Sequence, residues 1–251
     1  MAPIAGQNVL IIGGSSGIGF AVAKLALAEK ANVIIASSNK DKVDNAVNRL
    51  KGDSSSPSGQ VTGYTVDLAG EDVEAQLEKL FTEATTKAGP LDHIVYTAGK
   101  GQSPALADTN LATAVSTARL PIIVPLFIGK IAPKFLHSGY TSSITFTSGS
   151  AAEKPVPRYS VLSAFAAGLN FLGKCLAVEL APLRVNIVAP GATETEMWGT
   201  YADFLRDFSS KNSLLGKPAR PEDVAEAFVY LMKNIDATGS VVSTNGGAPL
   251  K

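Results

Sequence analysis

The fold of this chain can be inferred from residues Asn8-Val-Leu-Ile-Ile-Gly-Gly-Ser-Ser-Gly-Ile-Gly19. It begins with a short apolar run of strand-forming residues and continues into a glycine-rich turn, and a helical pattern follows from Phe20 to Glu29. Glycines let the backbone approach a pyrophosphate closely, while the free N–H groups and positive dipole end of the helix stabilise its charge. This order predicts a dinucleotide site, whose expected contacts are Gly13, Ser15, Ser16, Gly17, Ile18 and Gly19.

The next predicted strand, Asn32–Ala36, indicates which dinucleotide binds. It ends in Ser37, Ser38 and Asn39, where an NAD-preferring protein carries an acid for the ribose 2′-hydroxyl group. Because no acid is present and these side chains can donate hydrogen bonds to a 2′-phosphate, we expect NADP(H) as the cofactor. Lys40 either adds positive charge to this site or is an ordinary solvated residue.

Two further strands end where the cofactor is expected to lie. The strand 61–66 is followed by Asp67 and Leu68, which we expect beside the adenine. The strand that begins at Ile94 ends in a turn of small residues, Ala98 and Gly99, as is needed where backbone passes close to a ligand.

These segments, together with 180–186, Pro190-Gly191 and 239–247, resemble the short-chain dehydrogenase/reductase family over essentially the whole chain. The resemblance implies one α/β domain over residues 1–251, a doubly wound Rossmann fold with a parallel sheet and helices on both faces. It further implies a substrate lid near residues 192–215 and assembly into a homodimer or homotetramer. The cofactor contacts that it implies after the sixth strand are Pro190, Gly191, Thr193 and Thr195.

The catalytic residues of the family are missing from this chain. Ordinary members use a Tyr-x-x-x-Lys pair on a helix, a serine before it and an asparagine farther upstream. Counting back from Ala177-Val-Glu-Leu180 places the lysine position at Ala166 and the tyrosine position at Leu162. Counting forward from Ile144-Thr-Phe-Thr-Ser148 places the serine position at Gly149. We therefore expect no ordinary Tyr-Lys catalysis.

Three other residues are candidates for a role in catalysis. Arg119 falls at the asparagine position, and its guanidinium group either binds a substrate oxygen or pairs with a nearby acid or phosphate. Tyr159, three residues before Leu162, is either a substrate contact or a residue of the rim. Glu153 either reaches the pocket or is a solvated charge.

Loss of the proton donor narrows the chemistry. Reduction of a ketone creates an alkoxide that needs an acid, whereas hydride delivery to an iminium cation yields a neutral amine and needs none. We therefore expect an NADP(H)-dependent reductase of noncanonical mechanism, acting on an iminium or similar electrophile in specialised metabolism. The missing tetrad and Arg119 also resemble the fungal reductase/Diels–Alderases of prenylated indole alkaloid pathways, so a pericyclase or other non-redox cyclase is an alternative. A non-enzymatic NADP-binding sensor is a third interpretation.

An apolar stripe follows the expected lid start at helical spacing, formed by Met197, Trp198, Tyr201, Phe204, Leu205 and Phe208. Either this stripe lines a lid, or it packs onto the core. A lid of this composition suits a bulky apolar small molecule.

Composition argues against other classes of partner. The chain has 22 Lys and Arg residues against 22 Asp and Glu residues, and no basic run indicates nucleic acid or an anionic membrane. We expect no signal peptide and no apolar run long enough to cross a bilayer, and so a cytoplasmic protein. His93 and His137 are isolated, so we expect no metal site.

Overall fold

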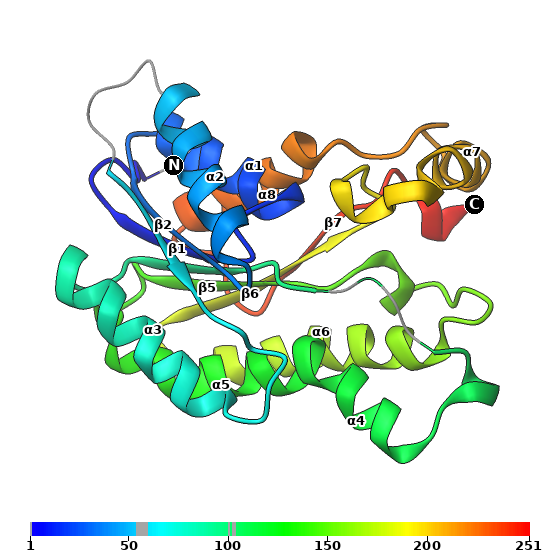
Figure 1. Cartoon of the computed structure of the whole chain (residues 1–251), viewed down its shortest axis with the longest axis horizontal. Helices are drawn as coiled ribbons and strands as arrows, with labels where there is room; N and C mark the ends of the chain where they lie inside the picture. Colours follow the sequence, from blue (N-terminus) through cyan, green and yellow to red (C-terminus); the bar gives the residue numbers. More distant parts are fainter. Residues whose placement is uncertain (1, 54–59, 100, 102–103) are drawn as a thin grey trace.

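The computed structural model describes residues 2–53, 60–99, 101 and 104–251. Its centre is a parallel 7-stranded sheet in the order β3-β2-β1-β4-β5-β6-β7 (Figure 1). The strands are β1 (Asn8–Ile12), β2 (Asn32–Ser37), β3 (Val61–Thr65), β4 (His93–Tyr96), β5 (Ser143–Thr147), β6 (Arg184–Pro190) and β7 (Val241–Thr244). Strand order reverses between β1 and β4, which makes the carboxyl ends of these two strands the expected ligand crevice.

Helices cover both faces of the sheet, as predicted. The upper face in Figure 1 carries α1 (Gly17–Ala28), α2 (Lys40–Asp53) and α8 (Pro221–Lys233). The lower face carries α3 (Val73–Ala88), α4 (Leu111–Ala118), α5 (Val124–Ile131) and α6 (Ser160–Glu179), while α7 (Ala202–Asn212) lies toward the C-terminal end of the chain. The short helices are η1 (Leu106–Asp108), η2 (Arg119–Ile123), η3 (Ala132–Lys134), η4 (Ser150–Ala152), η5 (Glu196–Tyr201) and η6 (Ala248–Leu250).

Side chains of the strands point alternately to the two faces of the sheet, and a hydrophobic core lies on each face. In β1, Leu10 and Ile12 pack with α3, α5 and α6, whereas Val9 and Ile11 pack with α1, α2 and α8. Because side chains of a strand point alternately to opposite faces, a continuous apolar strand fills both layers. The single doubly wound domain expected from the sequence is therefore confirmed.

A π-helical turn, η2, joins α4 to α5 where the family asparagine is expected. Pro121 lies in this turn and has no N–H group to donate, which favours a break in the regular helix. Val124 donates its backbone N–H to Arg119 O, one residue farther back than in an α-helix. Leu120 O is thereby left to accept the Tyr96 hydroxyl group at 2.9 Å, and burial raises the pKa of Tyr96 far above its ordinary value. Tyr96 is thus a structural tie and not a proton donor.

Buried polar residues stabilise the amino-terminal ends of β4 and β6. The Arg184 guanidinium group donates to the backbone carbonyl groups of Tyr140, Thr141, Leu231, Met232, Asn234 and Ala237, several of them at the C-terminal end of α8. His93 is buried between Ser143 Oγ at 2.8 Å and Gln7 Oε1 at 2.9 Å. Burial, with a contribution from Arg184, lowers the pKa of His93 to about 3. His93 is therefore a neutral structural residue.

Two helical stretches correct the expectation that no apolar run is long enough to cross a bilayer. By length and composition alone, Leu111–Lys134 and Ser160–Glu179 both qualify, and only 17% and 22% of their most apolar windows are buried within the chain. Such helices are weak indications of a membrane span, and here both pack against the sheet. Separate residues of α5 and α6, such as Ile128 and Leu169, lie in the lower core.

Candidate cofactor and active site

The glycine turn at the carboxyl end of β1 is packed so closely that side chains are excluded. A Cβ atom on Gly19 would lie 2.3 Å from Gly13 O and 2.5 Å from Thr97 Oγ1. A Cβ atom on Gly13 would lie 2.6 Å from Thr97 Oγ1 and 2.7 Å from Ala98 N. The turn therefore brings β1, β4 and the start of α1 into direct backbone contact. This is the cradle that a dinucleotide needs, so the residues present fit such a cofactor.

The N-terminus of α1 provides the expected anion-binding groups. α1 begins at Gly17, so the N–H groups of Gly17, Ile18 and Gly19 lie in its first turn. The preceding Ser16 makes no side-chain capping bond, and Ser15 is buried beside it. One amide is taken, because Gly17 N donates to Glu196 Oε2 at 3.0 Å. Sequence reasoning missed Glu196, since a contact across 179 residues leaves no local signal.

The end of β2 carries the residues expected at the 2′-phosphate. Ser37 is half-buried, and Ser38 and Asn39 are exposed. Asn39 Oδ1 accepts the backbone N–H of Lys42 at 2.9 Å and so caps α2. Lys40 forms an exposed ion pair with Asp44 at 2.5 Å, which raises the pKa of Lys40. Of the two interpretations of Lys40, this contact favours the surface one.

The loop after β3 is tied to the π-helical turn by Arg119. Asp67 Oδ1 accepts the Ala69 N–H at 2.9 Å, and Leu68 is buried in the lower core. Arg119 Nη1 donates to Ala69 O at 3.0 Å and also to Gly70 O. This observed contact gives Arg119 a structural role in positioning the loop expected beside the adenine. The substrate contact expected from the sequence stays a prediction.

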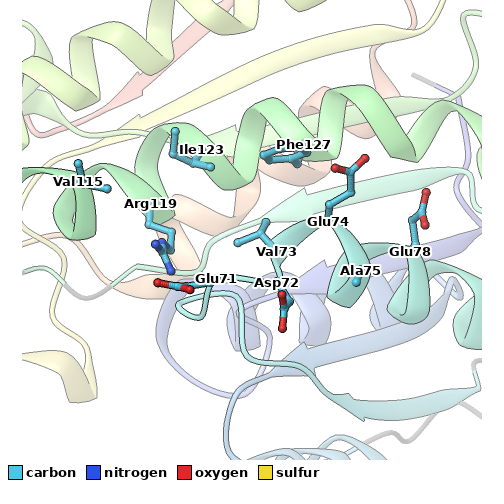
Figure 2. A pocket seen from close by; sticks show the side chains of 10 residues that line it. All are labelled: Glu71, Asp72, Val73, Glu74, Ala75, Glu78, Val115, Arg119, Ile123 and Phe127. Carbon is cyan, nitrogen blue, oxygen red and sulfur yellow. The ribbon is translucent and has the colours of Figure 1, made fainter. Parts of the chain in front are cut away.

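Figure 2 shows the groove into which Arg119 projects, between this loop and α4–α5. The groove has a volume of about 610 Å³, with apolar side chains on one wall and acidic side chains on the other. Its lining residues are Glu71, Asp72, Val73, Glu74, Ala75, Glu78, Val115, Arg119, Ile123 and Phe127. Lys130 pairs with Glu74, and Lys134 lies 3.9 Å from Glu78. None of the glycine-turn residues lines this groove, so it is separate from the expected cofactor cleft.

The positions assigned to the catalytic tetrad lie at the carboxyl end of β5 and at the start of α6. Gly149 follows β5 in extended backbone with φ −172°, which any residue can adopt. A Cβ atom there would meet only Pro190 O, at 3.7 Å. Leu162 is half-buried in the first turn of α6, and Ala166 is buried one turn later. These three side chains carry no group that can donate a proton.

Tyr159 and Glu153 lie on the rim before α6. Tyr159 immediately precedes the helix, is 41% exposed, and its hydroxyl group has no hydrogen-bond partner among the described residues. Glu153 is exposed, and its Oε1 accepts the Ser243 hydroxyl group at 2.9 Å. The structure thus gives Glu153 a partner on β7, and catalytic roles for both residues stay predictions.

The loop after β6 returns to the glycine turn. A Cβ atom on Gly191 would lie 2.9 Å from Asn245 Cα, so Pro190-Gly191 passes tightly against the segment after β7. Thr193 is buried and donates its hydroxyl group to Gly191 O at 3.1 Å. The side chain of Thr195 lies against Gly17, since a Cβ atom on that glycine would be 3.1 Å from Thr195 Cγ2. Thr195 and the glycine turn are therefore brought together, as the resemblance implies.

The apolar stripe of the expected lid does not pack onto the core. It occupies η5 and α7, and four of its six residues are exposed: Met197, Tyr201, Phe204 and Phe208. Phe204 and Phe208 stack on each other with ring centroids 6.4 Å apart. Of the two interpretations, this exposure favours a surface that covers a ligand or a partner.

Comparison with known proteins agrees with this geometry. The family model of the SDR-like Rossmann domain matches residues 2–251. The chain is 46% identical to the short-chain dehydrogenase/reductase ATR9 of Stachybotrys chlorohalonatus over 255 residues, which cover 100% of both chains. It is 38% identical to the solved reductase/Diels–Alderase MalC of Malbranchea aurantiaca, with a TM-score of 0.93 over 99% of this chain and 98% of MalC. The chain therefore belongs to the short-chain dehydrogenase/reductase family.

Proposed function

We propose that the protein is an NADP(H)-dependent reductase that delivers hydride to an iminium, or a similarly activated electrophile, of a bulky apolar specialised metabolite. One observation carries the proposal. The glycine cradle has no room for a Cβ atom at Gly13 or Gly19, while Gly149, Leu162 and Ala166, at the positions assigned to the proton relay, offer no acid. The relatives among fungal short-chain dehydrogenase/reductases support a reductase of this kind.

The chain's own residues account for cofactor binding. The diphosphate would be held by the turn and by the N-terminus of α1. A 2′-phosphate would receive hydrogen bonds from Ser37, Ser38 and the Asn39 amide, whose Oδ1 is engaged in capping but whose Nδ2 can donate. When bound, the cofactor supplies the hydride.

The missing donor is consistent with an iminium substrate. Hydride addition to the iminium carbon moves the C=N electron pair onto nitrogen and yields a neutral amine, so no proton transfer occurs at the reacting atoms. Gly149 leaves open space beside Pro190, where an ordinary family member would place a hydroxyl group. The exposed aromatic residues of η5 and α7 supply apolar surface for a large substrate.

The test compares two substrates of the same shape with NADPH that carries deuterium at its transferable position. A dihydroisoquinolinium iminium should accept the deuterium, whereas the matching cyclic ketone should not be reduced above background. Equal or faster reduction of the ketone would overturn the proposal, because a proton donor would then have to be present.

A second activity, cycloaddition, is favoured by the likeness to MalC, which is described as a reductase/Diels–Alderase. Its test uses a substrate that already carries the diene and the alkene, incubated with NADP⁺ so that no hydride is available. A protein-dependent excess of one stereoisomer would support a cyclase. If the protein binds NADP(H) but turns over neither substrate, the remaining interpretation is a non-enzymatic NADP-binding sensor.

We also propose that the chain assembles as a homodimer or homotetramer. Its proposed location is the cytoplasm. Support for the assembly comes from exposed apolar side chains on α4, α5 and α6, namely Leu111, Val115, Leu126, Phe171 and Val178. Sedimentation velocity should find an oligomer for the wild type, and Phe171→Glu should shift it toward monomer. A monomeric wild-type protein would contradict this proposal.

A further inference from the structure

The lid segment places a carboxylate at the expected anion site. Glu196 Oε2 accepts the N–H of Gly17 at 3.0 Å, at the positive end of α1. The first turn of α1 contains no acidic residue of its own, and Ser16 makes no capping bond. The charge that satisfies this helix end therefore comes from the start of η5, on another part of the fold.

Glu196 differs from the carboxylate two residues before it. Glu194 is paired with Arg206 at 2.5 Å, and Arg206 also binds Asp203 at 2.6 Å. Glu196 forms no ion pair with any residue in the described part of the chain, and its carboxylate accepts the N–H of Gly17. Both acids border a second groove, of about 430 Å³, that runs between α1 and the lid.

The two ends of the lid are held differently. Its far end is fixed to the segment after β7, because Leu214 N and Leu215 N donate to Gly246 O at 2.9 and 3.3 Å. Its near end pairs with Ala219, whose O accepts the Glu194 N–H at 2.9 Å, and then rests on Gly17 through Glu196 and the side chain of Thr195. Between them the helix is broken at Gly199, whose φ of 47° and ψ of −128° are not helical. The contact with Gly17 therefore lies between the Ala219 pairing on one side and the break at Gly199 on the other.

We infer that Glu196 sets the affinity for the cofactor. Its carboxylate stands where a diphosphate oxygen is expected to bind, and two anions at one helix end repel each other. The entering diphosphate must displace Glu196, and displacement releases residues 195–201 from the glycine turn. Glu196 is therefore a positioning residue through which cofactor binding and contact of the lid with the glycine turn exclude each other. The inference rests on the proposed binding of NADP(H).

Affinity for NADPH, measured by calorimetric titration, tests the displacement. Glu196→Gln keeps the shape and the hydrogen-bond acceptor but removes the charge, and it should bind NADPH about threefold to tenfold more tightly. The gain should shrink in high salt, because screening weakens the repulsion. Glu222→Gln is the matched control, since Glu222 lines the same groove without contacting Gly17, and its affinity should equal that of the wild type. Unchanged or weaker binding by Glu196→Gln overturns the inference.

Hydrogen exchange tests the fastening without any cofactor. In the wild type, the peptide that contains Gly17 and the peptide 195–201 should be protected, and Glu196→Ala should expose both. Added NADP⁺ should expose 195–201 in the wild type while protecting the glycine turn. Unchanged exchange in Glu196→Ala overturns the inference even if NADP(H) binds. Absence of NADPH and NADH binding in all variants would instead defeat the proposed function.

Discussion

Two glycine positions at the carboxyl edge of the sheet differ in the room that they leave for a side chain. At Gly19 an added Cβ atom would lie 2.3 Å from a backbone oxygen, in contact with elements that cannot give way. At Gly149 an added Cβ atom would meet one atom at 3.7 Å, and the backbone there suits any residue. Packing therefore requires a glycine at position 19, whereas other residues would fit at position 149.

This contrast separates the part of the candidate site that the backbone maintains from the part that side chains supply. The cofactor half is built from backbone that touches backbone, so any change there alters the turn as well as the ligand contacts. The chemical half is built from side chains that project from β5 and α6, and these can be exchanged while the scaffold stays the same. A family scaffold can therefore keep its nucleotide cradle while its acid is exchanged, which is the combination that we propose for this chain.

The largest expected effect comes from filling the cradle. Gly19→Ala should weaken NADPH binding by more than about a hundredfold, because the turn cannot close around a methyl group. Calorimetric titration measures the loss, and circular dichroism checks that the variant is folded. Gly149→Ala is the matched control and should bind NADPH as the wild type does. Similar losses of NADPH affinity in both variants would contradict the difference between Gly19 and Gly149.

The next effect comes from rebuilding the chemical half. The triple variant Gly149→Ser, Leu162→Tyr, Ala166→Lys should gain ketone reduction about a hundredfold above the wild-type background, the scale of a placed general acid. The rate of NADPH oxidation with a cyclic ketone measures the gain. A folded triple variant that binds NADPH and shows no gain would indicate that the assigned positions do not face the nicotinamide.

An intermediate effect is expected at the end of β2. Ser38→Asp should reverse the preference from NADPH to NADH, with about a tenfold change in the ratio of affinities, because a carboxylate repels the 2′-phosphate and accepts the 2′-hydroxyl group. Parallel titrations with both cofactors measure the ratio. Tighter NADH binding by the unmodified protein would contradict the prediction of NADP(H).

A smaller effect is expected from releasing the loop after β3. Arg119→Ala removes the hydrogen bonds to Ala69 O and Gly70 O and should weaken NADPH binding about threefold to fivefold, with kcat nearly unchanged. A fall in kcat or in stereochemical purity at unchanged affinity would instead restore the substrate-polarising role. Lysine should rescue binding only in part, since it lacks the planar fork.

The smallest effect is expected at Tyr159, which lies outside the assigned donor position. Tyr159→Phe should keep turnover within about twofold of the wild type, because the exposed hydroxyl group transfers no proton. Steady-state kinetics with the iminium substrate measure it. A loss near a thousandfold would show that the tyrosine is the acid and that the alignment is wrong.

The strand, glycine turn and helix at residues 8–29 were predicted correctly, because close approach of backbone demands glycines at fixed spacing. The claim that no apolar run could cross a bilayer was wrong, since Leu111–Lys134 is long enough once the π-helical turn joins its two halves. The exposure of the apolar stripe in η5 and α7 was left open, because helical spacing gives a face and not what covers it.

Residue types at local spacing were enough to predict the fold correctly, and they also carry the prediction, still to be tested, that the proton donor is missing. The contacts of Glu196 with Gly17 and of Arg119 with the loop after β3 became visible only in the folded chain. Each contact joins segments that are remote in the chain, and the rotamer of a long charged side chain is set by whichever unsatisfied backbone group lies within reach. The local sequence pattern therefore does not predict which backbone group such a side chain binds.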